Sequence, residues 1–199
     1  MFKQNAPIIL ASTSKIRKKI LEEVALNFKV IAPTFDEDKE KKKLKFPPKK
    51  LAIFLAQQKA LSISEKFRDA YVIGSDQVCE FEEKEISKSK NAAEAIKQLT
   101  KFNGKIHFQN NAVVVALNGK IIFKNFSRVK LQMRKISAAE IKNYVETDQS
   151  WNCAGSYKYE GLGKHLFAKI SGDYYSVLGL AIQPLLNFLH QKKIIKFTT

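Results

Sequence analysis

A short apolar run, Ile8 to Ala11, is followed at once by the polar turn Ser12-Thr13-Ser14. Four consecutive apolar residues before a turn are typical of a buried strand. From Lys15 to Ala25 apolar residues recur at helical spacing, which predicts an amphipathic helix. A buried strand that leads directly into a helix is a building unit of α/β proteins, so we expect a fold of that class.

Strand and helix patterns continue along the chain and end with a hairpin and a last helix. The turn Asn118-Gly119 predicts the hairpin, and Ser137 with Glu140 predicts a capping box at a helix start. The pattern predicts strands at 28–32, 71–74, 107–117, 121–131 and 166–170, and helices at 51–63, 92–100, 137–145 and 180–191. Early alternation followed by a hairpin predicts an α/β protein with a mixed sheet.

The length of 199 residues and the 45% hydrophobic content favour a single domain over residues 1–199 with a full core. No run approaches the roughly eighteen apolar residues of a membrane span, and no signal-peptide pattern is seen, so we expect no membrane association and a cytoplasmic location. Cys79 and Cys153 form no CxxC pair, and a disulfide framework is not expected in so large a cytosolic chain. The histidines His107, His165 and His190 show no metal-ligand spacing, so zinc chemistry is not expected either.

The net charge of +16 indicates polyanionic partners: nucleotides, nucleic acid or acidic membranes. A compositional bias towards lysine explains the charge equally well. A basic nucleic-acid-binding protein built on the tract Lys39 to Lys50 is one alternative, but zinc-finger spacing and RNP-like aromatic motifs are missing, so nucleic acid is not expected. We expect the tract, including Lys41, Lys42 and Lys43, to steer an anionic substrate without forming its site.

The predicted first helix begins with several cations, which is the wrong sign for its macrodipole. A phosphate chain docked there would remove the conflict, because free backbone N–H groups, Ser12, Ser14 and Arg17 would converge on it. Helix capping by Thr13 or Ser14 with solvated lysines is the equally weighted alternative.

Acidic residues follow two predicted strands. Asp76 comes after strand 71–74, where α/β proteins often place ligands, and could bind a metal or accept a proton from water. The cluster Asp36-Glu37-Asp38 follows strand 28–32 and could complete a Mg²⁺ site with Asp76. A plain turn and a solvated acidic loop are the alternatives.

Two lysines complete the candidates. Lys59 lies one helical turn from both Leu55 and Ile63, so its stem is expected near the core and its head beside an anion. Lys88 cannot be told from its neighbours by composition.

Together these segments resemble the Maf (septum-formation) family. The resemblance covers residues 8 to 182, nearly the whole chain. It rests on Ile9 to Arg17, Phe35-Asp36-Glu37, Gln58-Lys59-Ala60, Gly74 to Cys79, Cys153 to Gly161 and Val177 to Leu180. The Asp76-Gln77-Val78-Cys79 segment and the segment from Cys153 are similar to the branch of the family that acts on 7-methyl-GTP. The dTTP/UTP branch is the alternative, since it shows Asp-Thr at the first segment.

The resemblance implies an elongated mixed-sheet fold, like that of inosine triphosphatases, with two lobes and a central cleft. It implies a Mg²⁺- or Mn²⁺-dependent hydrolase that converts a nucleoside triphosphate to monophosphate and pyrophosphate. The resemblance does not fix the oligomeric state, and a homodimer is one assembly consistent with it. By position, Asp76 would accept the proton and bind metal with Glu37. Phosphate would be bound by Ser12, Ser14, Arg17, Lys59 and Lys88, and the base would be selected by Ile16, Gln77 and Glu160.

Two segments depart from the family pattern. Lys15-Ile16 replaces Pro-Arg or Pro-Trp, and serines flank Lys88 where the family has Gly and Pro. The lost Trp removes a stacking partner for a cationic methylated guanine. These departures leave open a relative that binds nucleotide without turnover.

Overall fold

A mixed sheet forms the centre of the computed structural model, which describes residues 1–37, 40–41 and 44–198. Within these residues its strand order is β3-β2-β4-β6-β7-β8, with β5 paired to β4. β2 runs parallel to β3 and β4, and the other pairs are antiparallel. The strands are β2 (Ile8–Ala11), β3 (Phe28–Ile31), β4 (Tyr71–Phe81), β5 (Lys84–Ile86), β6 (Ile106–Leu117), β7 (Lys120–Met133) and β8 (Phe167–Ser171). A separate antiparallel pair joins the two ends of the chain, β1 (Phe2–Gln4) and β9 (Ile195–Phe197).

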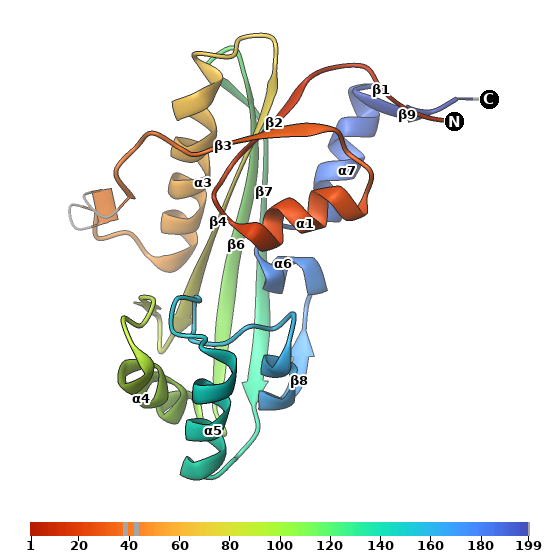
Figure 1. Cartoon of the computed structure of the whole chain (residues 1–199). Coiled ribbons are helices and arrows are strands. Elements are labelled where there is room, and N and C mark those ends of the chain that lie inside the picture. The colour runs from red at the N-terminus through yellow and green to blue at the C-terminus, as the bar shows by residue number, and fades with distance from the viewer. Residues whose placement is uncertain (38–39, 42–43, 199) are drawn as a thin grey trace.

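Helices cover both faces of the upper part of the sheet (Figure 1). α3 (Pro48–Ser64) packs on the face that carries Val72 and Val114, while α1 (Lys15–Glu23) and α7 (Ile182–Gln191) pack on the face of Ile73 and Val113. Alternate strand residues point to opposite faces, which explains why both sets are apolar.

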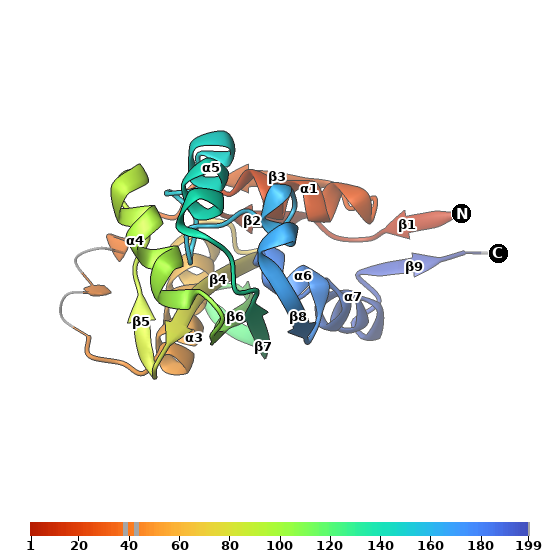
Figure 2. The ribbon, with the colours of Figure 1, turned by 90° about the horizontal axis from the view of Figure 1, so that it is seen from below.

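The lower part of the molecule has its own core. α4 (Ala92–Phe102), α5 (Ala138–Asp148) and the 3₁₀ helix η1 (Leu162–Leu166) surround it, and α4 and α5 lie side by side (Figure 2). α6 (Tyr174–Leu178) lies between the two parts (Figure 1). The long strands β4, β6 and β7 run through both lobes. The fold is therefore the expected elongated α/β arrangement with a mixed sheet.

Most predicted elements are confirmed. The capping box of Ser137 and Glu140 is present, and the hairpin turns at Asn118 and Gly119 with positive φ angles of 49° and 70°. α7 begins at Ile182 and tolerates Pro184 in its first turn, where backbone N–H groups have no helical partner. The short elements β1, β5, β9 and α6 were not predicted.

One boundary was wrong. The segment Ser75-Asp76-Gln77 is not a turn that closes the strand, because β4 continues to Phe81. The parallel pairing with β2 ends at Ile73, but pairing with β6 continues from Val72 to Glu80 and keeps the backbone extended. Asp76 therefore lies inside a strand.

Other expectations concern residues outside the described part of the chain: Asp38, Lys39, Lys42 and Lys43. Among the described helices, none has the length and apolar character needed to cross a bilayer.

Candidate active site

The candidate site lies at a gap along one edge of β4. On that edge β2 pairs as far as Ile73 and β5 pairs from Cys79 onward, so residues 74–78 have no strand neighbour there in the described part of the chain. A pocket of about 210 Å³ opens at the gap, with a second of about 480 Å³ beside it. The two share six lining residues, Ser14, Arg17, Glu37, Lys59, Lys88 and Asn152, and together form one cleft between the lobes.

Close packing of α3 on β4 positions the central charges. A Cβ atom at Gly74 would lie 2.3 Å from the carbonyl oxygen of Ala56, so only glycine allows this approach. The contact brings Lys59 of α3 to Asp76 of β4, and the Lys59 ammonium donates a hydrogen bond to Asp76 Oδ1. Asp76 is 4% exposed, and its other oxygen, Oδ2, is buried without a hydrogen-bond partner among the described residues. The cleft therefore contains one unsatisfied carboxylate oxygen.

Glu37 joins this pair. Its Oε2 lies 2.9 Å from Lys59 Nζ, and its Oε1 lies 3.0 Å from Lys41 Nζ, which also lies 3.5 Å from Glu85. Burial opposes ionisation of Glu37, but the two lysines outweigh it and lower its pKa to about 2. For Lys41, burial is likewise outweighed, by Glu37, Asp76 and Glu85, and its pKa is raised. Both groups are therefore charged at neutral pH.

Lys41 lines the pocket itself. The expectation that the lysine tract acts from outside the site is therefore wrong for Lys41, while Lys42 and Lys43 lie outside the described residues. The ion pair with Glu37, four positions earlier in the chain, holds the Lys41 side chain at the cleft.

The hydroxyls before α1 hold Arg17 inside the cleft. Ser14 caps the helix by accepting from the Arg17 backbone N–H at 3.4 Å. Ser12 Oγ accepts from Arg17 Nη1 at 3.4 Å, and Arg17 Nε donates to the Gly179 carbonyl at 2.7 Å. Burial lowers the pKa of Arg17, while Asp76 and Glu37 oppose that shift. Capping by Ser14 is thus confirmed, and Arg17 nevertheless points towards the acidic groups.

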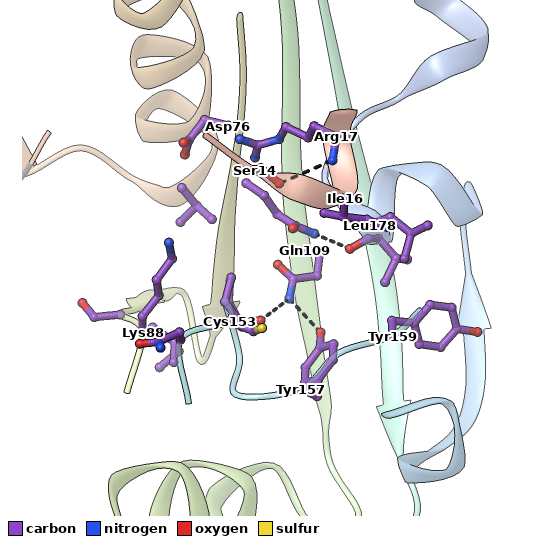
Figure 3. Close-up of a pocket in the computed structure, with 18 of the residues that line it drawn as sticks. Ser14, Ile16, Arg17, Asp76, Lys88, Gln109, Cys153, Tyr157, Tyr159 and Leu178 are labelled. Carbon is purple, nitrogen blue, oxygen red and sulfur yellow. Dashed lines mark hydrogen bonds between the residues drawn. The ribbon is translucent and has the colours of Figure 1, made fainter. Parts of the chain in front are cut away.

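The residues expected to select the base line the pocket of about 210 Å³, where Figure 3 shows Ile16 beside Leu178. Ile16 lines it from α1, and Glu160 is exposed at its rim together with Lys88. Gln77 also lines it, but its Nε2 donates to the carbonyls of Ser176 at 3.2 Å and Val177 at 2.7 Å. All the predicted site residues therefore meet at one cleft, with Ser12 in the second pocket.

Sequence reasoning missed other residues that line the cleft: Glu85, Gln109, Asn152, Cys153, Tyr157 and Tyr159. A signal existed for Gln109, because it begins a run of three amides inside an otherwise apolar predicted strand. The Cys153 thiol is half-buried, and burial together with the charge of Glu160 raises its pKa, which keeps it protonated and unreactive.

Of the four carboxylates that line the cleft among the described residues, Glu37, Asp76, Glu85 and Glu160, the first two meet at Lys59 and are the candidates to bind a divalent cation. No group of three or more His, Cys, Asp or Glu that could hold a metal occurs among the residues described. Glu37 and Asp76 both contact Lys59, and Asp76 Oδ2 has no protein partner, so the available donors are oxygens, which suit a hard cation such as Mg²⁺.

Comparisons with known proteins identify the family. A sequence profile described as "Maf-like protein" matches residues 7–192. A "Nucleoside triphosphate pyrophosphatase" of Bradyrhizobium diazoefficiens is 36% identical over 98% of both chains. A "7-methyl-GTP pyrophosphatase" of Bartonella henselae is 40% identical over 94% of this chain and 96% of its own. A "Nucleoside triphosphate pyrophosphatase" of Ruegeria pomeroyi is 37% identical over 95% and 98%. The chain that carries this charged cleft therefore belongs to the Maf-like protein family.

Proposed function

We propose that this protein is a nucleoside triphosphate pyrophosphatase that releases a nucleoside monophosphate and pyrophosphate. The observation that carries the proposal is the buried Asp76, whose free Oδ2 lies in a cleft lined by Arg17, Lys41 and Lys59. A carboxylate that can take a proton, surrounded by cations that can bind phosphates, suits hydrolysis of a phosphoanhydride. The names of the relatives from Bradyrhizobium and Ruegeria support the same reaction.

The phosphate chain would lie along the N-terminus of α1. Ser12 and Ser14 offer hydroxyls there, and Arg17, Lys59 and Lys88 offer charge-assisted hydrogen bonds. Arg17 is already held by Ser12 and Gly179, so it needs little reorganisation to meet an anion.

Asp76 Oδ2 would accept the proton of the attacking water. The water oxygen forms a bond to the α-phosphorus, and the bond from that phosphorus to the bridging oxygen breaks, so pyrophosphate leaves. Arg17, Lys59 and Lys88 would balance the charge that develops on the leaving group. Lys59 also fixes the carboxylate through Oδ1, which leaves Oδ2 as the carboxylate oxygen without a hydrogen-bond partner among the described residues.

Glu37 and Asp76 are the residues that would hold a divalent cation, Mg²⁺ or Mn²⁺. Such a cation, when bound, supplies positive charge to the phosphoryl oxygens. In the described structure Lys59 and Lys41 neutralise these carboxylates, so binding of the cation has to compete with three ion pairs, Lys41–Glu37, Lys59–Glu37 and Lys59–Asp76.

We further propose a guanine-type base, with 7-methyl-GTP as a specific candidate. The relative named for 7-methyl-GTP, from Bartonella, supports this assignment. The Glu160 carboxylate at the rim can accept from the N1–H and N2–H₂ groups of guanine, and Ile16 and Gln77 line the same pocket. A dTTP/UTP enzyme is the rival assignment. A cytoplasmic location and a possible homodimeric assembly are proposals from the sequence alone.

Product analysis tests the proposal. The protein is incubated with canonical and modified nucleoside triphosphates in the presence of Mg²⁺ or Mn²⁺, and nucleotides and phosphates are separated. We expect monophosphate and pyrophosphate in equal amounts. Diphosphate with orthophosphate would refute the site of attack. Binding without turnover would favour the alternative of a relative that only binds nucleotide. The departures at Lys15-Ile16 and at the serines beside Lys88 suggest that alternative.

A further inference from the structure

Gln109 of β6 is a buried polar side chain that the proposed reaction does not use. It is 1% exposed and lines the pocket beside Cys153 and Tyr157. It pairs with Cys79 of β4, so its side chain lies on the sheet face opposite α3. Its neighbour Asn110 points to the other face, where its Nδ2 donates to Glu80 at 2.7 Å.

The orientation of the Gln109 amide is fixed by its partners. Nε2 donates to the Ala154 carbonyl at 3.1 Å and to the Tyr157 hydroxyl at 2.7 Å. A carbonyl oxygen can only accept, so a flipped amide would place two acceptors against each other. The nitrogen must therefore face Ala154, and the oxygen must face away from it.

Tyr157 is itself held in place. Its hydroxyl lies 3.0 Å from Nε2 of His107, whose ring is buried and stacks on Phe102 with centroids 4.4 Å apart. The hydroxyl can accept from Gln109 and donate to a neutral His107. A chain of aromatic packing and hydrogen bonds thus makes the Gln109 amide rigid.

The oxygen of that amide has no partner. Gln109 Oε1 is buried and makes no hydrogen bond to any described residue. In Figure 3 the amide oxygen points into the pocket, away from Tyr157. A buried acceptor without a partner is unfavourable, and native proteins seldom leave one unsatisfied. Asn110 Oδ1 is likewise buried without a partner among the described residues, but only Gln109 of the two lines the cleft, so the partner of its oxygen is expected to be a molecule that enters the pocket.

We propose that Gln109 Oε1 accepts a hydrogen bond from an N–H group of the nucleobase and so determines base specificity. The inference rests on the proposed function and deepens it. Gln109 and Glu160 would place two acceptors at the base end, whereas the Gln77 donors are already bound to backbone carbonyls. Two acceptors match a base edge with adjacent donors, as in guanine, better than the single N3–H of uracil or thymine, which lies between two carbonyls.

The test compares three triphosphates that differ in single donors: GTP, 1-methyl-GTP, which lacks N1–H, and ITP, which lacks the N2 amino group. Gln109→Met keeps the length of the side chain and removes the acceptor. Asn110→Leu is the matched control, a buried amide in the same strand that faces away from the pocket. We measure kcat/KM for each nucleotide and Kd for the analogues with a methylene bridge between the α- and β-phosphorus.

Gln109→Met is expected to lower kcat/KM and affinity for GTP about 3- to 10-fold, the range of one hydrogen bond. For the analogue that lacks the donor bound by Gln109, kcat/KM and affinity should change less than about twofold in the variant. The ratio of kcat/KM for GTP to that for this analogue should therefore be smaller in the variant than in the wild type. Asn110→Leu should leave both ratios as in the wild type. If Gln109→Met does not fold, Gln109→Asn is used instead, because its shorter side chain keeps an amide but moves the oxygen away from the base. The same decrease in the kcat/KM ratio of GTP to the analogue is expected.

Unchanged ratios in a folded Gln109 variant would overturn the inference while the proposed function stands. A wild-type protein that neither hydrolyses nor binds any of the nucleotides would overturn both.

Discussion

Replacing Asp76 by Asn tests the proposed chemistry most directly. The substitution keeps the shape of the side chain but removes its charge and turns one oxygen into a donor. Oδ2, the oxygen without a partner among the described residues, can then no longer take a proton. Loss of a general base costs about 10²–10⁴ in rate, or roughly 3–5 kcal/mol of barrier. Weaker binding of a divalent cation would add to this, so we expect kcat to fall at least about 100-fold.

The protein should remain folded. Lys59, whose side chain is 11% exposed, keeps Glu37 at 2.9 Å, and the remaining amide oxygen of Asn can still accept from it. The charge-assisted hydrogen bond from Lys59 becomes a weaker neutral one, so we expect the free energy of unfolding to fall by about 1–2 kcal/mol. For a chain of this size that corresponds to a melting temperature about 2–8 °C lower.

Glu80→Gln is the matched control. Glu80 lies on the same strand and the same face, is 7% exposed, and pairs with Arg128 at 2.6 Å, but it does not line the cleft. We expect a similar loss of melting temperature with turnover within about twofold of the wild type. Turnover at saturating Mg²⁺ and thermal melts without metal are compared for both variants. A folded Asp76→Asn protein that keeps more than about a tenth of wild-type turnover would refute the proposed role.

Three further predictions concern the charged rim of the cleft. The pKa of Glu37 is about 2, below its unfolded value, so its ion pairs stabilise the fold above the unfolded pKa and are lost as pH falls through about 2. In urea titrations from pH 6 to pH 2.5, wild type should therefore lose about 1–2 kcal/mol more than Glu37→Gln, after allowance for solvent screening, and equal losses would contradict the ion pairs. Lys41→Met should lower kcat/KM about 3- to 10-fold even at high salt, because Lys41 lines the cleft, whereas a loss that disappears with added salt would show steering from a distance. Glu160→Gln should reduce the preference for guanine over uracil nucleotides by about 1–3 kcal/mol in kcat/KM ratios, and a wild type that prefers dTTP or UTP would exclude the guanine assignment.

The sequence predicts the elements whose signals are local. The capping box of α5 and the hairpin at Asn118-Gly119 depend on neighbours in the chain, and both form as expected. The end of β4 could not be found in this way. Gly74 and Ser75 look like turn residues, but pairing of Asp76 with Ala112, far along the chain, keeps the segment extended. Gly74 is required there for the approach of α3 and not for a turn.

In the site, too, some residues have local signals in the sequence and others depend on distant contacts. Arg17 and Lys59 could be proposed because their charges conflict with their surroundings, and Asp76 and Glu37 because they follow predicted strands. The resemblance supplied the roles of Ile16, Gln77, Lys88 and Glu160. Lys41 was expected outside the site and Gln109 was not assigned. The position of Lys41 depends on its ion pair with Glu37, and that of Gln109 on a hydrogen bond to Tyr157, which is distant in sequence. An unsatisfied oxygen is a property of three-dimensional packing and leaves no trace in composition.

The long strands shared by both lobes have a mechanical consequence. A cleft between two lobes suggests a hinge, yet β4 and β6 remain paired from Val72 to Glu80, across the level of the cleft, and β7 continues the ladder. Bending the molecule there would break several ladder hydrogen bonds at once. Opening and closing by rotation of one lobe is therefore disfavoured. A nucleotide bound as proposed would have to enter and leave past the exposed side chains at the rim, such as Lys88 and Glu160, while the paired strands that carry Asp76 keep their spacing.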